Sequence, residues 1–376
     1  MRRTFITYFI FIVAMSAFIM LRIYAGSHKD MMRPSVATDT EKPSEDAQTQ
    51  TEENNVAALR DETAEEEEEE VIDPALKDDK EYLWHGPINP ETEFTGLLPR
   101  IVCWGDSLTV SLDGKSAYPD ILRDLSGCEV VNYGVESENT AMIAMREGGL
   151  RVKVKATVLP SGSDLIPIFL RTEDDGHVFY LDNGDGGVNP CSINGIQGEL
   201  QKINGSYYFK RASKGERYVV DEGTQFKTFA MTDAKEGDIL VIFAGTNDLP
   251  DARSVNNIIE LERSMLEAVQ CDKYIIVGLT YAGGIPEINE VNEALSKEFG
   301  DHFVDIRKYM INYGVEDVGI TKTKQDIADI KKGEIPTSLR RDYVHGNKHY
   351  HRLLGEQIYR RMVYLGYLKQ PEGENT

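Results

Sequence analysis

Three polar side chains in this sequence are of the types that nucleophilic acyl transfer requires, and two of them are suitably spaced. Ser107 stands in the stretch 105–109 (GDSLT), and Asp342 precedes His345 by three residues. A serine hydroxyl is a weak nucleophile at neutral pH, so it needs an imidazole to take its proton and a third group to orient that imidazole. Three residues of separation within one turn let the Asp342 carboxylate reach Nδ1 of His345. Nε2 of the same ring would then be free to face Ser107.

The same chemistry needs hydrogen-bond donors for an oxygen that becomes negative. Gly134 and Asn247 each follow a short apolar run that is typical of a buried strand, and Ser107 follows a third such run. In open parallel sheets, functional groups gather at the carboxyl ends of the strands. Each residue alone has a common structural explanation, because an isolated Asn at a strand end usually caps a turn. Their shared placement at strand ends indicates a single site.

Five short apolar runs predict the strands that would position these residues: 101–104, 130–131, 239–243, 274–279 and 303–306. Apolar residues at helical spacing follow most of these runs, most clearly at 118–125, 258–269 and 350–365. Continuous apolar strands that alternate with amphipathic helices predict an α/β fold, in which a parallel sheet is covered on both faces.

The stretch 150–233 interrupts this alternation with many short alternating runs and Gly-rich turns. We predict a small β-rich subdomain inserted into an α/β domain that comprises 81–149 and 234–376. A structural addition beside the cleft is the favoured interpretation of the insert, and carbohydrate or wall-polymer binding is the alternative. The acidic strings 173–175 and 182–185 together lack the spacing of an EF-hand loop and are interpreted as solvated turns.

Taken together, the motifs resemble those of the SGNH or GDSL-type esterases and acetylhydrolases. Four blocks occur in that family's order: 105–109 (GDSLT), 132–135 (NYGV), 245–248 (GTND) and 342–345 (DYVH). The resemblance covers 99–149 and 235–366, and it implies a flavodoxin-like three-layer α/β/α fold. One block departs from the family's pattern, because residues 137–139 (SEN) stand where many members have a further glycine. That departure affects the expected shape of the pocket.

The resemblance also implies a role for each polar residue of the triad. Ser107 would be the nucleophile, His345 the general base, and Asp342 the group that orients the base. This scheme requires neither a metal ion nor a cofactor.

By the same resemblance, the oxyanion hole would consist of the backbone N–H groups of Ser107 and Gly134 and the side-chain amide of Asn247. Asp106 and Asp248 would be supporting residues that hold the two loops in place.

The other histidines fit the role of base less well than His345 does. His349 and His351 follow it closely, but neither has an aspartate three residues before it. Ser137 and Ser338 lack a Gly-Asp setting, so we interpret them as turn or cap residues rather than nucleophiles.

Residues 1–33 have the features of a membrane anchor. The uncharged run 5–21 is 17 residues long, at the short end of the roughly 17 to 25 that cross a bilayer as a helix. Two arginines before it favour export of the rest of the chain. Residues 34–80 are strongly acidic and poor in apolar side chains, which predicts a disordered linker. We therefore expect a single-pass anchor with the catalytic domain outside the cytoplasm, and secretion after signal cleavage is the alternative.

The composition limits the classes of function. Asp and Glu number 63 against 41 Lys and Arg, and the net charge of -22 argues against a nucleic-acid-binding surface. The four cysteines show no CxxC or CxxH pairing that would indicate zinc.

These observations predict an extracytoplasmic serine esterase, with O-acetyl groups on carbohydrate or cell-wall polymer as the simplest substrate. A lipase, lysophospholipase or thioesterase of the same fold is the alternative within the enzyme class, and acyl transfer to an acceptor other than water is a third option. A surface carbohydrate-binding protein that uses the insert is the alternative from another class. A scaffold would have no chemical reason to keep Ser107, Asn247, Asp342 and His345 together.

Overall fold

The computed structural model describes residues 98–110, 117–178, 186–248, 254–281 and 286–368, all of which belong to one unit, Glu70–Thr376. The predicted membrane anchor (1–33) and acidic linker (34–80) lie outside the described residues. Within the described ranges, no helix combines the length and the apolar character needed to cross a membrane.

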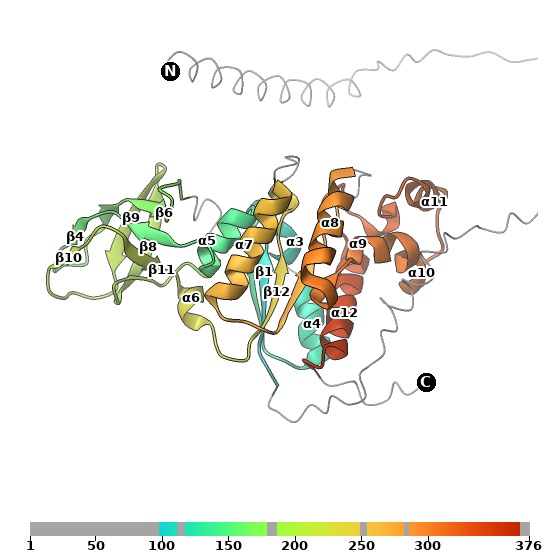
Figure 1. Ribbon diagram of the computed structural model, residues 1–376, viewed down its shortest axis with the longest axis horizontal. Coiled ribbons are helices and arrows are strands. Elements are labelled where there is room, and N and C mark those ends of the chain that lie inside the picture. The colour runs from blue at the N-terminus through green and yellow to red at the C-terminus, as the bar shows by residue number, and fades with distance from the viewer. Residues whose placement is uncertain (1–97, 111–116, 179–185, 249–253, 282–285, 369–376) are drawn as a thin grey trace, which may run out of the picture. The chain divides into compact units, whose positions relative to one another are not determined.

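A five-stranded parallel sheet forms the centre of the α/β part, in the order β14-β13-β12-β1-β2. Figure 1 labels two of its strands, β1 and β12. Its strands are β1 (Ile101–Gly105), β2 (Val130–Gly134), β12 (Ile239–Phe243), β13 (Tyr274–Val277) and β14 (Phe303–Val304). Gly105 pairs with Gly134 on one side and with Phe243 on the other, so β1, β2 and β12 end level with one another. The residues that follow these three strands therefore meet at one edge of the sheet.

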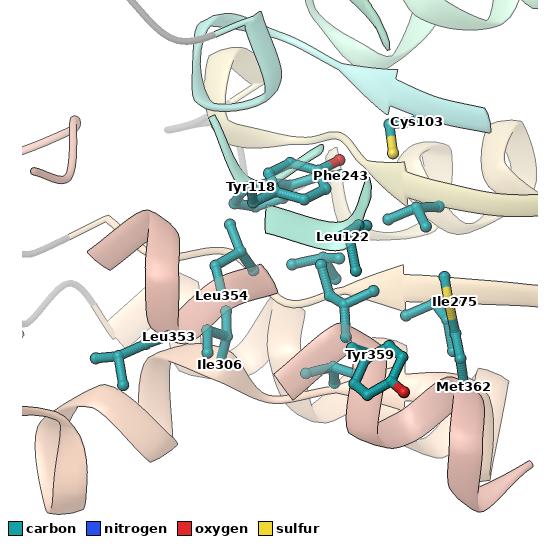
Figure 2. Packing of buried hydrophobic residues seen from close by; sticks show 14 of the residues in the cluster. Cys103, Tyr118, Leu122, Phe243, Ile275, Ile306, Leu353, Leu354, Tyr359 and Met362 are labelled. Atoms are coloured by element: carbon teal, nitrogen blue, oxygen red, sulfur yellow. The ribbon is translucent and has the colours of Figure 1, made fainter. Parts of the chain in front are cut away.

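Helices cover both faces of this sheet. Successive residues of β1 point to opposite faces: Ile101 and Cys103 join one hydrophobic cluster, and Val102 and Trp104 join the other. The helices on the first face, whose packing Figure 2 shows, are α4 (Tyr118–Ser126) and α12 (Lys348–Tyr364), and those on the second are α5 (Thr140–Glu147), α7 (Ser254–Ala268) and α8 (Pro286–Phe299). The predicted three-layer α/β/α architecture is confirmed.

Shorter helices connect these layers. They are α3 (Ser107–Val110), α6 (Phe229–Asp233), α9 (Ile306–Tyr309), α10 (Val315–Asp317) and α11 (Lys324–Lys331). The first of them begins at the predicted nucleophile, directly after β1.

Between α5 and α6 the chain forms antiparallel strands. Seven of them make one sheet in the order β5-β9-β8-β7-β11-β3-β6, and β4 pairs with β10. Their bounds are β3 (Val152–Val154), β4 (Thr157–Leu159), β5 (Ile166–Ile168), β6 (Leu170–Thr172), β7 (Cys191–Ile193), β8 (Ile196–Ile203), β9 (Ser206–Arg211), β10 (Tyr218–Val220) and β11 (Thr224–Lys227). This β-rich part has its own core, in which Phe209 and Phe226 are fully buried. It accompanies the α/β fold as expected, and its boundaries at 150 and 233 stay a prediction.

Two hairpin turns in the β-rich part follow from Asn-Gly pairs. Asn194 and Gly195 join β7 to β8, and Asn204 and Gly205 join β8 to β9. All four residues have positive φ values, from 48 to 79°. Two-residue turns that match the twist of a hairpin need positive φ at both positions, which Asn and Gly adopt at low cost.

Candidate active site

Ser107 and His345 are in hydrogen-bond contact although they lie 238 positions apart in the sequence. Oγ of Ser107 is 3.0 Å from Nε2 of His345. On the other side of the ring, Nδ1 is 2.9 Å from Oδ2 and 3.1 Å from Oδ1 of Asp342. With the ring proton on Nδ1, Nε2 accepts the hydrogen bond from the Ser107 hydroxyl. This geometry suits a general base next to a nucleophile.

The turn from β1 into α3 positions Ser107. Asp106 is fully buried, and its Oδ1 accepts a hydrogen bond of 2.9 Å from the N–H of Leu108. Gly105 is needed at this turn because a Cβ there would lie 2.1 Å from Oγ1 of Thr109. The close contact between strand and helix therefore presents Ser107 at the edge of the sheet.

A tight turn closed by Asp342 positions His345. Oδ1 of Asp342 accepts hydrogen bonds of 2.8 Å from the backbone N–H groups of Val344 and His345. Burial acts to raise the pKa of Asp342, but these bonds and the one from the His345 ring outweigh it, so the pKa lies below its ordinary value. The carboxylate is therefore ionised at neutral pH.

The first turn of α12 holds the residues that follow His345. Oδ1 of Asn347 accepts a hydrogen bond of 2.9 Å from the N–H of His349, and its Nδ2 donates to the carbonyl oxygen of Ser338 at 2.8 Å. Gly346 packs so closely that a Cβ there would lie 2.0 Å from Cγ of Tyr350, which is buried. Asn347 thus caps the helix and holds the preceding loop at the same time.

Two buried aspartates of α11 accept hydrogen bonds from residues of that loop. Asp326 accepts hydrogen bonds from the N–H and the hydroxyl of Ser338, at 2.8 and 2.7 Å. Asp329 accepts from the N–H of Thr337 at 2.8 Å and from Arg340 at 3.0 Å. This network was not predicted, although Asp326 and Asp329 are three residues apart and so lie on one face of a helix.

Gly134 is the last residue of β2, as predicted, and it lies beside α3. Its N–H group already has a hydrogen-bond partner. It donates a hydrogen bond of 2.8 Å to Oδ1 of Asn132, whose Nδ2 donates to the carbonyl oxygen of Thr109 at 3.0 Å. A Cβ at position 134 would lie 2.5 Å from the backbone nitrogen of Val110, so only glycine fits there. An oxyanion would have to displace Asn132 to use this donor.

Asn247 lies in the 3₁₀ helix η1 (Thr246–Asp248), and its amide also has partners. Nδ2 donates to the carbonyl oxygen of Glu138 at 2.9 Å and to Oδ2 of Asp106 at 3.3 Å. The predicted donor is thus held between the turn after β2 and the turn after β1. The bond to Asp106 is the longer of the two and the easier one to exchange.

The turn that follows β2 contains the departure from the family's pattern. Ser137 is exposed and has a φ of 65°, in the left-handed region that favours glycine. Both ends of the turn are fixed, because the N–H of Val135 donates to the carbonyl oxygen of Gly105 at 3.1 Å and Asn139 caps α5. The only sequence signal for this turn was the missing glycine at 137–139.

Two carboxyl groups, the buried Asp106 and the partly buried Asp248, stand behind these donors. Burial raises the pKa of Asp106 to about 7, and it also raises that of Asp248. Asp248 accepts hydrogen bonds from the N–H and the hydroxyl of Thr140, at 2.8 and 2.9 Å, and so joins η1 to the start of α5. Asp106 carries less than a full negative charge near neutral pH, which reduces the repulsion that a negative oxygen would meet there.

The other described histidines have different surroundings. His302 stacks on Tyr274 with a centroid distance of 4.1 Å, and His351 is buried within α12. Across the described ranges, no group of three or more His, Cys, Asp and Glu side chains could hold a metal ion.

Comparison with known proteins returned matches of structure alone. No family model matches the sequence, and no curated protein does. A lipase/acylhydrolase from Enterococcus faecalis is 16% identical over 73% of this chain and 100% of its own, with a TM-score of 0.39. A lipolytic protein of the G-D-S-L family from Desulfitobacterium hafniense is 14% identical over 70% of this chain and 98% of its own, with a TM-score of 0.35.

Two further similar structures are acetylesterases. An acetyl xylan esterase is 12% identical over 69% of this chain and 98% of its own, with a TM-score of 0.38. A peptidoglycan O-acetylesterase is 12% identical over 72% of this chain and 92% of its own, with a TM-score of 0.32. What this chain has in common with these proteins is the fold.

Proposed function

We propose that this chain is a serine esterase that uses Ser107, His345 and Asp342. The observation that carries the proposal is the continuous contact from Oγ of Ser107 through the His345 ring to the Asp342 carboxylate, with distances of 3.0 and 2.9 Å. A nucleophile, a base and an orienting carboxylate in this order are what acyl transfer from an ester requires.

In the proposed mechanism, Oγ of Ser107 attacks the ester carbonyl carbon and its proton passes to Nε2 of His345. The tetrahedral intermediate collapses when His345 returns that proton to the leaving alcohol, which departs and leaves an acyl group on Ser107. Water then attacks the acyl group, with His345 as base again, and the acid is released. Asp342 holds the ring and stabilises its positive charge in both halves of the reaction.

We assign the oxyanion donors on the basis of the partners described above. The N–H of Ser107 and the amide of Asn247 are two of them, with Asn247 exchanging its long bond to Asp106 for one to the substrate. We assign the third donor to the N–H of Gly134, which would exchange its bond to the Asn132 side chain for one to the substrate.

An O-acetyl group on a carbohydrate or cell-wall polymer is the substrate we propose. The triad is open to solvent, with side-chain exposures of 23% for His345 and 50% for Asp342. Tyr343 is 62% exposed in the same turn, and its ring lies 5.2 Å from the Arg340 guanidinium. An exposed aromatic ring among polar groups suits a sugar ring better than an acyl chain that must be buried. A lipid ester is the alternative substrate within the same chemistry.

We further propose that the chain acts outside the cytoplasm, attached by the N-terminal anchor expected from residues 1–33. The support is the apolar run followed by an acidic stretch in the sequence. Cleavage of that segment and release of the enzyme is the alternative.

The proposal is tested by comparing purified wild-type protein with Ser107→Ala on nitrophenyl acetate, acetylated xylan, O-acetylated peptidoglycan and a phospholipid. We expect acetate release by the wild type from at least one polysaccharide, and a loss of more than about 1,000-fold in Ser107→Ala. Ser264→Ala, which changes a serine on α7, is the matched control and should keep full activity. Equal rates for Ser107→Ala and wild type would refute the esterase mechanism, whereas preference for phospholipid would refute only the glycan substrate.

A further inference from the structure

A buried arginine lies directly behind the oxyanion side of the candidate site. Arg146 on α5 is completely buried, and its Nε donates to Oε2 of Glu138 at 2.7 Å. One terminal nitrogen donates to the carbonyl oxygen of Tyr133 at 2.8 Å, and the other donates to the carbonyl oxygen of Gly186. The guanidinium also lies 5.2 Å from the centre of the Trp104 ring. Every side of this charge is therefore occupied by a group from a different segment.

Glu138 connects this arginine to Asn247. Its carboxylate is paired with Arg146, and its own carbonyl oxygen accepts the 2.9 Å hydrogen bond from Nδ2 of Asn247. Glu138 is also the residue that follows Ser137 in the strained turn. Any shift of the Glu138 backbone would therefore move the Asn247 amide and the turn together.

The β-rich part reaches the same place through Gly186 and Gly187. A Cβ on Gly186 would lie 2.2 Å from Cγ2 of Val135 and 2.9 Å from Arg146. A Cβ on Gly187 would lie 2.8 Å from the ring of Tyr133. This segment is thus packed tightly against the end of β2 and the turn that follows it.

We infer that Arg146 and Glu138 are positioning residues for the oxyanion hole, and that the β-rich part contributes to catalysis by holding this pair through the carbonyl oxygen of Gly186. This inference rests on the proposed esterase function. Arginine suits the role because its planar fork donates in several fixed directions at once, which a lysine cannot do. A displacement of about 1 Å of a group that contacts the reacting atoms can cost on the order of 100-fold in rate.

The test uses Arg146→Lys, which keeps the buried positive charge, and Glu138→Gln, which keeps an acceptor but leaves the Arg146 charge without its counter-ion. We expect kcat on nitrophenyl acetate to fall by about 10- to 100-fold in Arg146→Lys and by less in Glu138→Gln, with KM changed by less than about threefold. A residue that only supported the fold would lower the active fraction and leave kcat per active site unchanged. Active sites are counted by titration of Ser107 with a fluorophosphonate.

A second readout concerns the oxyanion alone. Ser107 adds through Oγ to the carbonyl carbon of a trifluoromethyl ketone, its proton passes to His345, and the ketone oxygen becomes the oxyanion. The affinity for this ketone should weaken in Arg146→Lys by about the same factor as kcat/KM, while the affinity for the acetate product stays the same. Unchanged ketone affinity together with unchanged kcat would overturn the inference.

A glycine pair tests the contribution of the β-rich part if Arg146→Lys fails to fold. Gly187→Ala introduces a methyl group against Tyr133, whereas Gly223→Ala, at the same φ of 83°, meets nothing within 4 Å. Both variants should lose stability, but only Gly187→Ala should lose kcat and ketone affinity. Equal kcat per active site in the two variants would show that the β-rich part does not contribute to catalysis. If Ser107→Ala were as active as the wild type, the proposed esterase function would be wrong. If only Ser107→Ala lost activity and Arg146→Lys kept it, the esterase function would stand and the inference about Arg146 would be wrong.

Discussion

At the scale of single residues, the Asp342 carboxylate is the group whose charge state the structure defines best. Two backbone N–H groups and Nδ1 of His345 all donate to it, and its pKa is held below the ordinary value although burial acts in the opposite direction. It therefore stays ionised wherever the protein is used near neutral pH, and it stabilises the positive charge that His345 gains in the proposed reaction.

Asp342→Asn should lower kcat by about 100- to 1,000-fold, because the neutral amide cannot stabilise the positive charge of the His345 ring. The loss is no larger because half of the Asp342 side chain is exposed to solvent, which screens its charge. The check is the steady-state rate on nitrophenyl acetate, at equal concentrations of folded protein. Asp120→Asn is the matched control, since Asp120 is similarly exposed and pairs with Arg123 at 2.7 Å. A change in rate as small as that of the control would contradict the role given to Asp342.

Asn247→Ala should lower kcat by about 100- to 1,000-fold, because one oxyanion donor is lost. KM should change much less, since the carbonyl oxygen of the bound ester carries little charge before attack. Asn257→Ala, on the exposed side of α7, should match the wild type. If Asn247→Ala raised KM and left kcat intact, Asn247 would be a binding residue and not an oxyanion donor.

The residues that meet at the candidate site could be named from short local motifs, whereas the pairing of Ser107 with His345, 238 positions away, was expected only from the family resemblance. Asp342 and His345 are three residues apart, and Ser107 directly follows a recognisable strand. The partners of Gly134 and Asn247 could not be predicted. Whether the Gly134 N–H meets a substrate or the side chain of Asn132 depends on how the chain packs around β2, and no spacing rule fixes that choice.

At the scale of elements, the segment from α11 to α12 works as a support for His345. Asp326 and Asp329 hold residues 337–340 through several hydrogen bonds, and Asn347 ties the same segment to the start of α12. Hydrogen bonds hold the pKa of both aspartates below the ordinary value even though burial acts to raise it. Their contribution to stability is therefore present above about pH 4 and is lost as the pH falls further.

Asn347→Ala should lower the free energy of unfolding by about 1 kcal/mol, because α12 loses its N-terminal cap. It should also reduce kcat several-fold, since the loop that carries His345 loses its bond from Nδ2 of Asn347. Chemical unfolding and steady-state rates measure the two effects separately. Asn347→Ser keeps a capping oxygen without the Nδ2 donor, so it should recover stability more than rate. Recovery of both to the same degree would show that the loop does not depend on that bond.

At the scale of the whole molecule, a cavity of about 540 Å³ extends along the central sheet from Trp104 and Tyr133 to residues that precede β1 and β12, such as Arg100 and Asp238. Glu147 lines it and is 2% exposed; one carboxylate oxygen accepts from the N–H of Gly149 at 2.9 Å, and the other has no partner among the described residues. Burial raises the pKa of Glu147 to about 8. The folded protein thus holds a proton there that the unfolded chain releases near pH 4.5.

Because the folded-state pKa is the higher one, this group favours folding fully at low pH, and its contribution is lost as the pH rises from about 4.5 through 8. Glutamine does not titrate, so Glu147→Gln should not lose stability at this position as the pH rises. The difference in unfolding free energy between Glu147→Gln and wild type should therefore grow in favour of the variant between pH 5 and pH 9, by on the order of 3 kcal/mol. Urea unfolding at both pH values measures it, and a difference independent of pH would contradict the assignment.

The α/β/α architecture could be predicted because buried parallel strands give continuous apolar runs and the helices between them keep a clear period. The strand order in the β-rich part could not. Its strands are mostly three residues long, and pairings such as β11 with both β3 and β7 join segments that are far apart in the sequence. The contact of Gly186 with Arg146 could not be predicted either, because no sequence pattern pairs the β-rich part with the turn after β2.

The most direct test of the central claim is to find the acyl group on the enzyme. Wild-type protein is mixed with nitrophenyl acetate, quenched in acid during turnover, digested and analysed by mass spectrometry. We expect an acetyl group on the peptide that contains Ser107, which forms much more slowly in His345→Ala and does not form in Ser107→Ala. An acetyl group on a different residue, or one that forms equally well without His345, would contradict it.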